Sequence, residues 1–484
     1  MKISDIVNVL KNNDLVICYD DCLVNIDYVS YNSKDIKENT LFICKGNHFK
    51  EDYLKNAVSL GAVCYVSEVE YSTNIPKIIV TDVRKSLSLI AELFYTDNLF
   101  KIGITGTKGK TTVNYFINNI LTNYLGYKPG IIASHYLYTG KREGSHELTT
   151  PESLDLHKYF KEMSDCNLKY VSMEVSSQAI KHSRVYNMHF DIGIFLNISE
   201  DHISTLEHKD FEDYFSCKLE FLKMCDKVIV FKGTDHLDRV MEAVCDKDVI
   251  TFGFSDADYI IKNISNGSNI SFELFDGVNT EIYEINMLGE FNVVNAASAI
   301  IVGKIIGASY KDICKGLINT SISGRMNIIN KGVCPIIIDY AHNRLSAEAF
   351  YKALKDNFPN RKIKVIFGCP GDKGFNRRKE MGELAGMYAD YVYLTEEDPG
   401  HASVREICNE IAFYITKYHS NYEIIENRYK AIAKALRDAT SDDVIALLGK
   451  GDENYQIIGD TFVPYETDKE IVLKELSKIK GVKE

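Results

Sequence analysis

The sequence lacks any apolar run long enough to cross a membrane. Its most apolar long stretch, residues 291–309, contains Asn295 and Lys304 and is too polar to span a bilayer. A secretion signal is also missing, because Asp5 follows the first residues almost at once and no apolar segment comes after it. We therefore expect a cytoplasmic protein that has no membrane partner.

Positive charge is not in excess. The chain has 56 Lys and Arg against 68 Asp and Glu, a net charge of −12. A sequence-independent nucleic-acid binder needs a cationic face, so we expect no nucleic-acid partner, although a local loop can still hold the phosphates of a nucleotide. The 12 cysteines include no CxxC pair, so neither a zinc module nor a disulfide framework is predicted, which fits a reducing compartment.

Short apolar runs alternate with amphipathic stretches over most of the 484 residues, a pattern typical of α/β proteins. No repeat and no Pro/Gly/Ser-rich linker separates the parts, and we place domains at residues 1–97, 98–327 and 328–484. The segment Tyr259–Met287 alternates apolar and polar residues and predicts β-hairpins on the middle domain. The expected buried strands are Lys101–Thr105, Tyr170–Glu174, Asp191–Asn197, Lys227–Phe231, Ile336–Tyr340, Lys364–Gly368, Tyr391–Thr395 and Asp443–Leu448.

Polar or glycine-rich clusters follow six of these runs. In open α/β sheets, ligands bind beyond the carboxyl ends of the strands, so six clusters in that position indicate ligand-binding loops. The clusters are residues 106–112, 174–177, 197–202, 339–342, 371–374 and 449–453.

The first cluster belongs to the segment Ile102-Gly-Ile-Thr-Gly-Thr-Lys-Gly-Lys-Thr-Thr, which lies between an apolar run and an amphipathic stretch. Glycines let backbone amides wrap around phosphates, and the following helix adds its positive N-terminus. The strict P-loop spacing would need a glycine at Ile104, and a glycine-rich turn without a ligand is the alternative. We expect the nucleotide-binding residues to be Gly106, Thr107, Lys108, Gly109, Lys110, Thr111 and Thr112, with Lys110 on the β/γ-phosphates and Thr111 on Mg²⁺.

The form T-G-T-x-G-K-T-T resembles the Mur ligase family and its relative folylpolyglutamate synthase. The resemblance covers nearly the whole chain and is closest to the MurE group of tripeptide synthetases. It implies a three-domain α/β architecture: an N-terminal UDP-substrate domain, a central P-loop ATPase-type, mostly parallel sheet, and a Rossmann-like C-terminal domain. The implied activity is ATP- and Mg²⁺-dependent ligation of L-lysine or another diamino acid to UDP-N-acetylmuramoyl-L-Ala-D-Glu by a monomer, through an acyl phosphate.

Two segments resemble the parts of the family that hold the muramoyl peptide. Leu148-Thr-Thr-Pro-Glu resembles the TTP segment, which implies contacts from Thr149 and Thr150. Glu-Val-Ser-Ser-Gln resembles the segment EVSSH…R, which implies contacts from Ser176 and Arg184. His182 stands where the family has glutamine, so this sequence departs from the pattern at that contact.

Three residues resemble the family's metal ligands. Glu174 ends an apolar run, His202 lies in N-x-S-x-D-H, and Lys218 in Phe-Ser-Cys-Lys resembles the lysine of A-A-K, which is carbamylated in the family. Carbamylation turns a cation into an anion, so Lys218 could help to bind Mg²⁺. Taken alone, the histidine reads as structural and the lysine as a surface residue. Their spacing is two or three residues longer than the family's, which implies an inserted loop.

Other matches imply nucleotide and uridine contacts. Asn295 lies in G-x-F-N-x-x-N and is implied near the adenine, while Arg325 and Asp339 resemble residues that reach the nucleotide from the hinge and the third domain. For Arg325, an interdomain salt bridge is the alternative. Ser33 resembles the serine that contacts the uridine diphosphate, although Asn and Lys replace the flanking Asp and Arg of the family's D-S-R.

The C-terminal matches imply a pocket for the incoming amino acid. Its residues would be Arg378 for the carboxylate, with Asp398, Gly449 and Glu453 toward the polar end. The family's diaminopimelate-selecting D-N-P-R reads Glu-Asp-Pro-Gly here, and Gly400 cannot bind a second carboxylate with a side chain. The sequence therefore predicts lysine over diaminopimelate, unless the nearby His401 or Arg405 replaces the missing arginine.

Three other functions stay open. The first is another ligase of the same fold, such as a folylpolyglutamate synthase or a MurE paralogue that makes a different amide. The second is a P-loop kinase or GTPase, which the absence of a base-specific N-K-x-D motif disfavours. The third is a non-catalytic ATP-binding regulator, which is disfavoured by the presence of Lys110, Glu174, His202 and Lys218 together.

Overall fold

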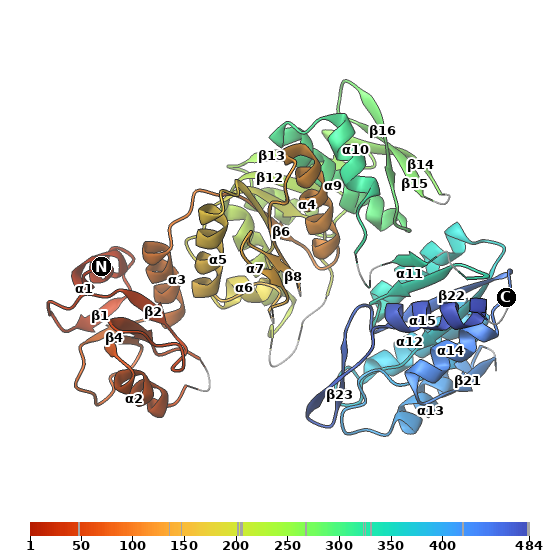
Figure 1. Cartoon of the computed structure of the whole chain (residues 1–484). Coiled ribbons are helices and arrows are strands. Elements are labelled where there is room, and N and C mark those ends of the chain that lie inside the picture. The colour runs from red at the N-terminus through yellow and green to blue at the C-terminus, as the bar shows by residue number, and fades with distance from the viewer. Residues whose placement is uncertain are drawn as a thin grey trace. The chain divides into compact units, whose positions relative to one another are not determined.

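The structure is a computed structural model that describes residues 1–46, 49–134, 136–146, 148–200, 203, 207–266, 269–322, 324, 326–329, 332–418 and 421–481 (Figure 1). The chain falls into two compact units. The first contains residues 1–261, 275–279 and 295–316, and the second contains residues 262–274, 280–294 and 317–484. Each unit has its own apolar core.

The N-terminal part of the first unit is a five-stranded sheet with the strand order β1-β5-β4-β3-β2. The pair β1 and β5 is antiparallel, and the other pairs are parallel. Ile3, Ile6, Val7 and Leu10 recur on one face of α1, which is buried in the core of this sheet. The elements are α1 (Ile3–Asn12), β1 (Val16–Tyr19), β2 (Tyr28–Ser30), β3 (Thr40–Ile43), α2 (Glu51–Ser59), β4 (Ala62–Ser67), β5 (Lys77–Val80) and α3 (Val83–Phe94).

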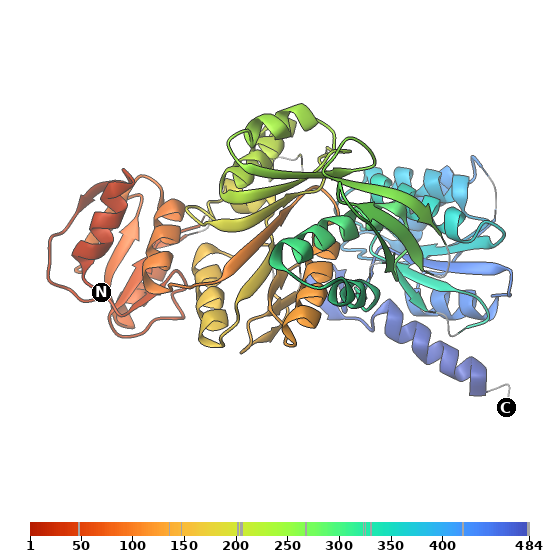
Figure 2. The same cartoon turned by 90° about the horizontal axis from the view of Figure 1, so that it is seen from above.

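The central sheet of the first unit has the order β13-β12-β11-β6-β10-β7-β8-β9. Its strands are parallel from β13 to β7, and β8 and β9 extend one edge in antiparallel fashion. Helices lie on both faces (Figure 2), which explains why the central strands are apolar throughout.

The strands of the central sheet are β6 (Phe100–Thr105), β7 (Gly130–Ala133), β8 (Tyr136–Tyr138), β9 (Glu143–Gly144), β10 (Tyr170–Glu174), β11 (Phe190–Phe195), β12 (Cys225–Phe231) and β13 (Asp248–Gly253). The helices of this part of the chain are α4 (Lys110–Leu125), α5 (Ser153–Asp165), α6 (Ser177–Lys181), α7 (Phe211–Lys223), α8 (Leu237–Ala243), α9 (Glu290–Ile306) and α10 (Tyr310–Ile318).

The segment predicted to form β-hairpins contains β14 (Tyr259–Ser265), β15 (Ile270–Phe275) and β16 (Thr280–Ile285). Successive strands are hydrogen-bonded neighbours, as expected for hairpins. Fully buried residues alternate with half-buried ones along β15, so the alternation in the sequence reports one face turned to the core.

The second unit contains a six-stranded sheet with the order β17-β18-β22-β19-β20-β21, which is parallel except for β17 at one edge. A two-stranded hairpin, β23 and β24, follows it. The elements are β17 (Asn327–Ile329), β18 (Ile336–Asp339), α11 (Arg344–Asn357), β19 (Lys362–Phe367), α12 (Asn376–Tyr388), β20 (Tyr391–Leu394), α13 (Val404–Ile415), β21 (Tyr422–Ile424), α14 (Arg428–Arg437), β22 (Asp443–Leu448), β23 (Tyr455–Ile458), β24 (Thr461–Pro464) and α15 (Asp468–Gly481).

The eight expected buried strands are confirmed as β6, β10, β11, β12, β18, β19, β20 and β22. Within the central sheet, Ile104 of β6 is in register with Glu174 of β10 and with Ile194 of β11. The carboxyl ends of these three strands therefore meet at one edge, and so do the loops that follow them.

The α/β class with mostly parallel sheets is confirmed, while the domain boundaries at 97 and 327 remain predictions. None of the helices in the described ranges is long and apolar enough to cross a membrane. The cysteines of the described chain are free thiols.

Candidate active site

The glycine-rich loop joins β6 to α4 at the carboxyl edge of the central sheet. Gly106 and Gly109 have φ angles of 154° and 90°, in the region that favours glycine. A Cβ at Gly109 would lie 2.4 Å from Oδ1 of Asn295, so a larger residue would collide there. The ammonium of Lys110 folds back on the loop and donates to the Gly106 carbonyl at 2.8 Å. The loop is therefore shaped as a phosphate cradle, with Asn295 of α9 beside it.

Asn197, directly after β11, fixes the outer side of this loop. Its Oδ1 accepts from the amide of Lys108 at 2.9 Å, and its Nδ2 donates to the Lys108 carbonyl at 3.1 Å. The Thr107 hydroxyl accepts from the amide of Ser199 at 3.1 Å. Thr111 and Thr112 lie in the first turn of α4, where the helix N-terminus is positive.

Glu174, at the end of β10, is a buried carboxylate at the same edge. Its two oxygens accept from the amide and the hydroxyl of Ser134, at 2.7 and 3.1 Å. The Ser134 hydroxyl is also 3.2 Å from that of Thr149. Sequence reasoning missed Ser134, because a serine after a short strand carries no signal of its own. These contacts hold Glu174 in place beside the predicted substrate segment.

Lys218 approaches the loop from α7. Its side chain is 1% exposed, and its ammonium donates to the Gly106 carbonyl at 2.9 Å. It lies over the ring of Tyr214, whose hydroxyl is 3.0 Å from that of Thr107. The surface-lysine alternative is wrong. Tyr214 was missed, although its place one helical turn before Lys218 puts both on one face of α7.

The substrate segments meet around Thr150. Its hydroxyl donates to the Glu174 carbonyl at 2.9 Å and lies 3.2 Å from the hydroxyl of Ser176. Arg184 donates to the Thr150 carbonyl and to Glu152, both at 3.2 Å. The structure thus brings Thr149, Thr150, Ser176 and Arg184 together with Glu174, as the motif spacing predicted.

Glu152 links these segments to the N-terminal sheet. It accepts from Lys45 at 2.5 Å as well as from Arg184. Although burial acts to raise it, Lys45 and Arg184 hold the pKa of Glu152 below its usual range. Burial, together with Arg84 and Arg184, lowers the pKa of the neighbouring His182, the C-cap residue of α6. Three cations and one carboxylate here favour an anionic ligand.

One predicted site residue lies in the N-terminal sheet, and two others lie outside the described residues. Ser33 lies between β2 and β3, where its carbonyl accepts from the side chain of Asn56 at 2.8 Å. His202 and Arg325 lie outside the described residues, so their predicted roles stay predictions.

In the second unit, Asp339 ends β18 with both carboxylate oxygens engaged. One accepts from the amide of Met326 and the other from the amide of Ala341, each at 2.7 Å. These bonds stabilise the chain on both sides of β18. The predicted contact between Asp339 and the nucleotide remains a prediction.

A buried lysine lies between two of the predicted amino-acid-binding residues. The ammonium of Lys450 is 2.9 Å from Asp398 and 2.6 Å from Glu453, and the side chain is 0% exposed. The hydroxyl of Tyr340 donates to the other oxygen of Glu453 at 2.8 Å. Lys450 was missed, because its two partners come from loops about fifty residues apart.

Glu397 is a third carboxyl group close to Lys450, Asp398 and Glu453. Burial raises its pKa to about 7, against the opposing charge of Arg428. A Cβ at Gly449, whose φ is 100°, would lie 2.5 Å from Oε2 of Glu397. Gly449 is therefore needed for the close approach of its loop to the carboxyl group.

Arg378, at the start of α12, is engaged within the protein. Its Nη1 is 2.7 Å from Glu410, and its Nη2 donates to the Gly371 carbonyl at 2.8 Å. Its Nε has no hydrogen-bond partner among the described residues. Its predicted pairing with a substrate carboxylate remains a prediction.

A side chain at Gly400 would be strained and would require Asp372 to move. Its φ is 55°, and a Cβ would lie 2.0 Å from Oδ2 of Asp372. His401 is 2.9 Å from Asp372, and Arg405 is 2.7 Å from Glu426. Both residues considered as substitutes for the missing arginine therefore already face carboxylates, and the neighbourhood of Gly400 is acidic.

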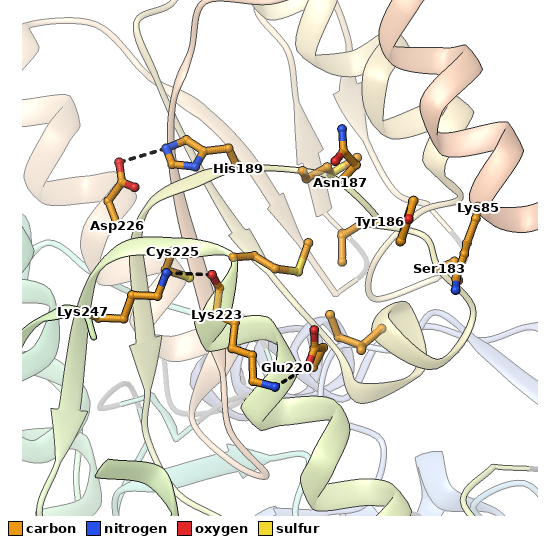
Figure 3. Close-up of a pocket in the computed structure, with 14 residues that line it drawn as sticks. Lys85, Ser183, Tyr186, Asn187, His189, Glu220, Lys223, Cys225, Asp226 and Lys247 are labelled. Carbon is orange, nitrogen blue, oxygen red and sulfur yellow. Dashed lines mark hydrogen bonds and ion pairs between the residues drawn. The ribbon is translucent and has the colours of Figure 1, made fainter. Parts of the chain in front are cut away.

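A cavity of about 550 Å³ lies at the opposite edge of the central sheet, where β11 and β12 begin. Figure 3 shows its charged rim, with His189 beside Asp226 and Glu220 beside Lys223, each pair at 2.9 Å. Because the glycine-rich loop follows the carboxyl end of β6, this cavity is not part of the candidate active site.

Two family descriptions match the parts of the chain that carry the site. The Mur ligase middle domain matches residues 104–303, and the Mur ligase glutamate ligase domain matches residues 324–451. The chain is 39% identical over 460 residues to the UDP-N-acetylmuramoyl-L-alanyl-D-glutamate--L-lysine ligase of Streptococcus thermophilus. That alignment covers 94% of this chain and 93% of the relative.

Solved structures share the fold. A UDP-N-acetylmuramoyl-L-alanyl-D-glutamate--2,6-diaminopimelate ligase is similar with a TM-score of 0.71 at 22% identity, over 94% of this chain and 95% of that one. The MurF ligase of Thermotoga maritima in complex with ADP is similar with a TM-score of 0.60 at 19% identity, over 94% and 98% of the two chains.

Proposed function

Because this chain belongs to the Mur ligase family, we propose that it is the ATP-dependent ligase that joins L-lysine to UDP-N-acetylmuramoyl-L-Ala-D-Glu in peptidoglycan precursor synthesis. The match to a lysine ligase over 94% of the chain supports this substrate pair. The acidic surroundings of Gly400 support lysine over an amino acid that carries a second carboxylate.

One observation carries the proposal. The half-buried ammonium of Lys110 is held against the glycine-rich loop, where it donates to the carbonyl of Gly106 at 2.8 Å. A cation fixed at this position favours a polyanion beside it. Such a site suits the phosphates of ATP, and the backbone amides of the loop and of α4 add donors.

The proposed chemistry is activation of an acyl group. The substrate carboxylate attacks the γ-phosphate of ATP, which gives an acyl phosphate and ADP. The amino group of lysine then displaces phosphate and forms the amide. Lys110 and the loop amides stabilise the negative charge that develops on the transferred group, the largest contribution of a protein to phosphoryl transfer.

The donor set near the loop fits Mg²⁺ in part. The Thr111 hydroxyl and the Glu174 carboxylate are hard oxygen donors of the kind this ion prefers, and His202 is the further predicted ligand. When bound, the ion neutralises charge on the phosphates. Ser134 holds the Glu174 carboxylate with two hydrogen bonds, which limits its motion.

Lys218 as an ammonium does not fit a cation site. Carbamylation by CO₂ would replace this positive group by an anion that offers two oxygen ligands. The burial of Lys218 supports this modification, since a carbamate formed on it would be shielded from bulk water. We therefore include a carbamylated Lys218 in the proposal.

For the amino acid, the charges of the second unit support a site for a distal ammonium. Glu397, Asp398 and Glu453 offer three carboxyl groups; Lys450 pairs with two of them, and the buried Arg428 is itself paired with Asp468. An additional ammonium would improve this balance, whereas a second carboxylate would worsen it. We propose that the enzyme works as a monomer in the cytoplasm.

The test is phosphate release from ATP with each substrate left out in turn. We expect release only when UDP-N-acetylmuramoyl-L-Ala-D-Glu and L-lysine are both present. Release that is unchanged without either of them would replace the ligase proposal by an ATPase or a regulator. Replacing L-lysine by L-glutamate separates this proposal from a folylpolyglutamate synthase-like activity.

A further inference from the structure

Near the contact between α6 and α7 lie three side chains, those of His208, Asp213 and Cys217, that take part in no step of the proposed reaction. His208 precedes α7, and Asp213 and Cys217 lie one turn apart on it, so both face the same side. A ring nitrogen of His208, a carboxylate oxygen of Asp213 and the sulfur of Cys217 all lie within 4.8 Å of one another. From these positions we infer a binding site for a divalent cation of the zinc type.

The three ligand atoms need to approach one another only slightly to coordinate an ion. Zn²⁺ with one nitrogen, one oxygen and one sulfur ligand keeps these atoms roughly 3.3–3.7 Å apart. His208 Nδ1 is already 3.3 Å from Asp213 Oδ2. Cys217 is a residue of the same helix as Asp213, so a rotation about its side-chain bond can bring the sulfur closer without moving the backbone.

The surroundings prepare the histidine for this role. His208 is fully buried, and its Nε2 is 2.9 Å from the hydroxyl of Ser177. When Ser177 accepts the Nε2 proton, Nδ1 presents its lone pair toward Asp213. Such a bond to the second ring nitrogen is the usual way in which proteins orient a metal-binding histidine.

A cation already occupies one side of this cluster. The ammonium of Lys181 forms an ion pair with Asp213 and donates to the Glu207 carbonyl at 2.7 Å. The side chain of Lys181 is 31% exposed, so it can leave the carboxylate for water when another cation arrives. Lys181 therefore competes with the metal, and its removal should strengthen binding.

The ligand types select the metal. Mg²⁺ prefers oxygen ligands, whereas the mixed nitrogen, oxygen and sulfur set suits Zn²⁺ and its spectroscopic substitute Co²⁺. The three side chains leave a fourth position open to water, as in zinc sites that are not purely structural. This cluster is thus distinct in chemistry from the Mg²⁺ ligands proposed near the glycine-rich loop.

Binding here has a consequence for the loop, which rests on the proposed function. Helices α6 and α7 lie side by side (Figure 1). Between Asp213 and the end of α7 lie Tyr214 and Lys218, which contact Thr107 and Gly106 of the loop. A metal that reorients the side chains of Asp213 and Cys217 changes the packing next to Tyr214 and Lys218, and we expect Zn²⁺ to slow phosphate release.

The direct test is a Co²⁺ titration of the full chain, which does not depend on catalysis. We expect one equivalent to produce the near-ultraviolet absorption of a thiolate bound to Co²⁺, and Zn²⁺ to abolish it. Cys217→Ala should remove this band and weaken Zn²⁺ binding at least about tenfold. Cys245→Ala, which removes an exposed thiol elsewhere, is the matched control and should keep the band.

Lys181→Met gives an independent test in the opposite direction and should tighten Zn²⁺ binding by about threefold or more, because it removes the competing ammonium. The site is refuted if the wild-type chain shows no thiolate band, or if Cys217→Ala binds Co²⁺ with the same spectrum. Metal binding without slower phosphate release would keep the site and reject its effect on the loop. A chain that binds Zn²⁺ but never forms the amide would reject the proposed function alone.

Discussion

The carboxyl edge of the central sheet and that of the C-terminal sheet are built alike but charged differently. Both consist of parallel strands followed by polar loops. At the central edge, Lys110 and Lys218 converge on a glycine-rich loop. At the C-terminal edge, Asp398 and Glu453 enclose Lys450.

The difference shows that the parallel sheet determines where the binding loops lie, whereas the residues of the loops determine whether the site is positively or negatively charged. A loop of backbone amides and ammonium groups suits phosphates, while a loop pair with surplus carboxylates suits an ammonium. In the proposed function, the two edges divide the reaction between them: one would hold ATP, and the other the amino acid. Changes at the two edges should affect different kinetic constants.

The largest expected effect is that of Lys110→Ala. It should slow the chemical step by roughly 100- to 5,000-fold, since one electrostatic contact to a transferring phosphoryl group contributes about 3–5 kcal/mol. Single-turnover phosphate release with both substrates present measures it. Lys141→Ala, which removes an exposed cation, is the control and should leave the rate unchanged. A normal rate in Lys110→Ala would contradict the hypothesis that this edge of the sheet binds the transferred phosphoryl group.

Lys218→Ala should lower the rate by about 100-fold or more if a carbamate supplies ligands at the same edge. Acetate or formate should partly restore activity, because a small carboxylate fills the vacated place. With ¹³C-bicarbonate, the wild type should show a carbamate carbon signal that Lys218→Ala lacks. A wild-type spectrum without that signal, from an active enzyme, would contradict the carbamate.

Glu453→Gln should act at the other edge and raise the KM for L-lysine by roughly 10- to 100-fold. This follows from a hydrogen bond between charged groups that contributes about 1.5–3 kcal/mol. The KM for ATP should stay unchanged. Glu466→Gln, which breaks an exposed ion pair with Lys474, is the matched control. Equal increases in both KM values would mean that the two edges do not divide the reaction as described.

The smallest expected effect concerns pH and Glu397. Because burial raises the pKa of this carboxyl to about 7, the folded protein holds a proton that the unfolded chain releases near pH 4.5. The folded state therefore loses stability as the pH rises from about 4.5 to 7, by at most about 3 kcal/mol.

Glu397→Gln keeps the shape and removes this titration. Thermal unfolding of the variant at pH 5, 6, 7 and 8 should show a smaller decrease in Tm over this range than that of the wild type. Parallel Tm curves for the two proteins would show that Glu397 ionises normally in the folded state. Glu406→Gln, at an exposed position, serves as the control.

Much of the central edge could be predicted from the sequence because its signals are local. The glycine spacing determines the loop, and the apolar runs determine β6, β10 and β11. Thr150, Ser176 and Arg184 were implied by the resemblance of their segments to the Mur ligase family, and the structure brings them together. Two residues were missed here, Ser134 and Tyr214. Both contact residues that lie far away in the sequence, Glu174 and Thr107.

The C-terminal edge was harder to predict because its chemistry depends on long-range pairs. Nothing local marks Lys450 as the partner of Asp398, or Asp372 as the neighbour of Gly400. The sequence gives three acidic positions, but not the raised pKa of Glu397, which results from burial between β22 and the loop after β20. His202 and Arg325 stay predictions because they lie outside the described residues.

The most direct measurement is a competition between L-lysine and meso-diaminopimelate at equal concentration, with ATP and UDP-N-acetylmuramoyl-L-Ala-D-Glu. The products are identified by mass. Gly400 has no side chain to pair with a second carboxylate, and His401 and Arg405 already face carboxylates. The missing pairing costs on the order of 2–4 kcal/mol, or about 30- to 1,000-fold in selectivity. We expect the lysine product to dominate and one ADP to form for each amide. An excess of the diaminopimelate product, or ADP formed without any amide, would contradict it.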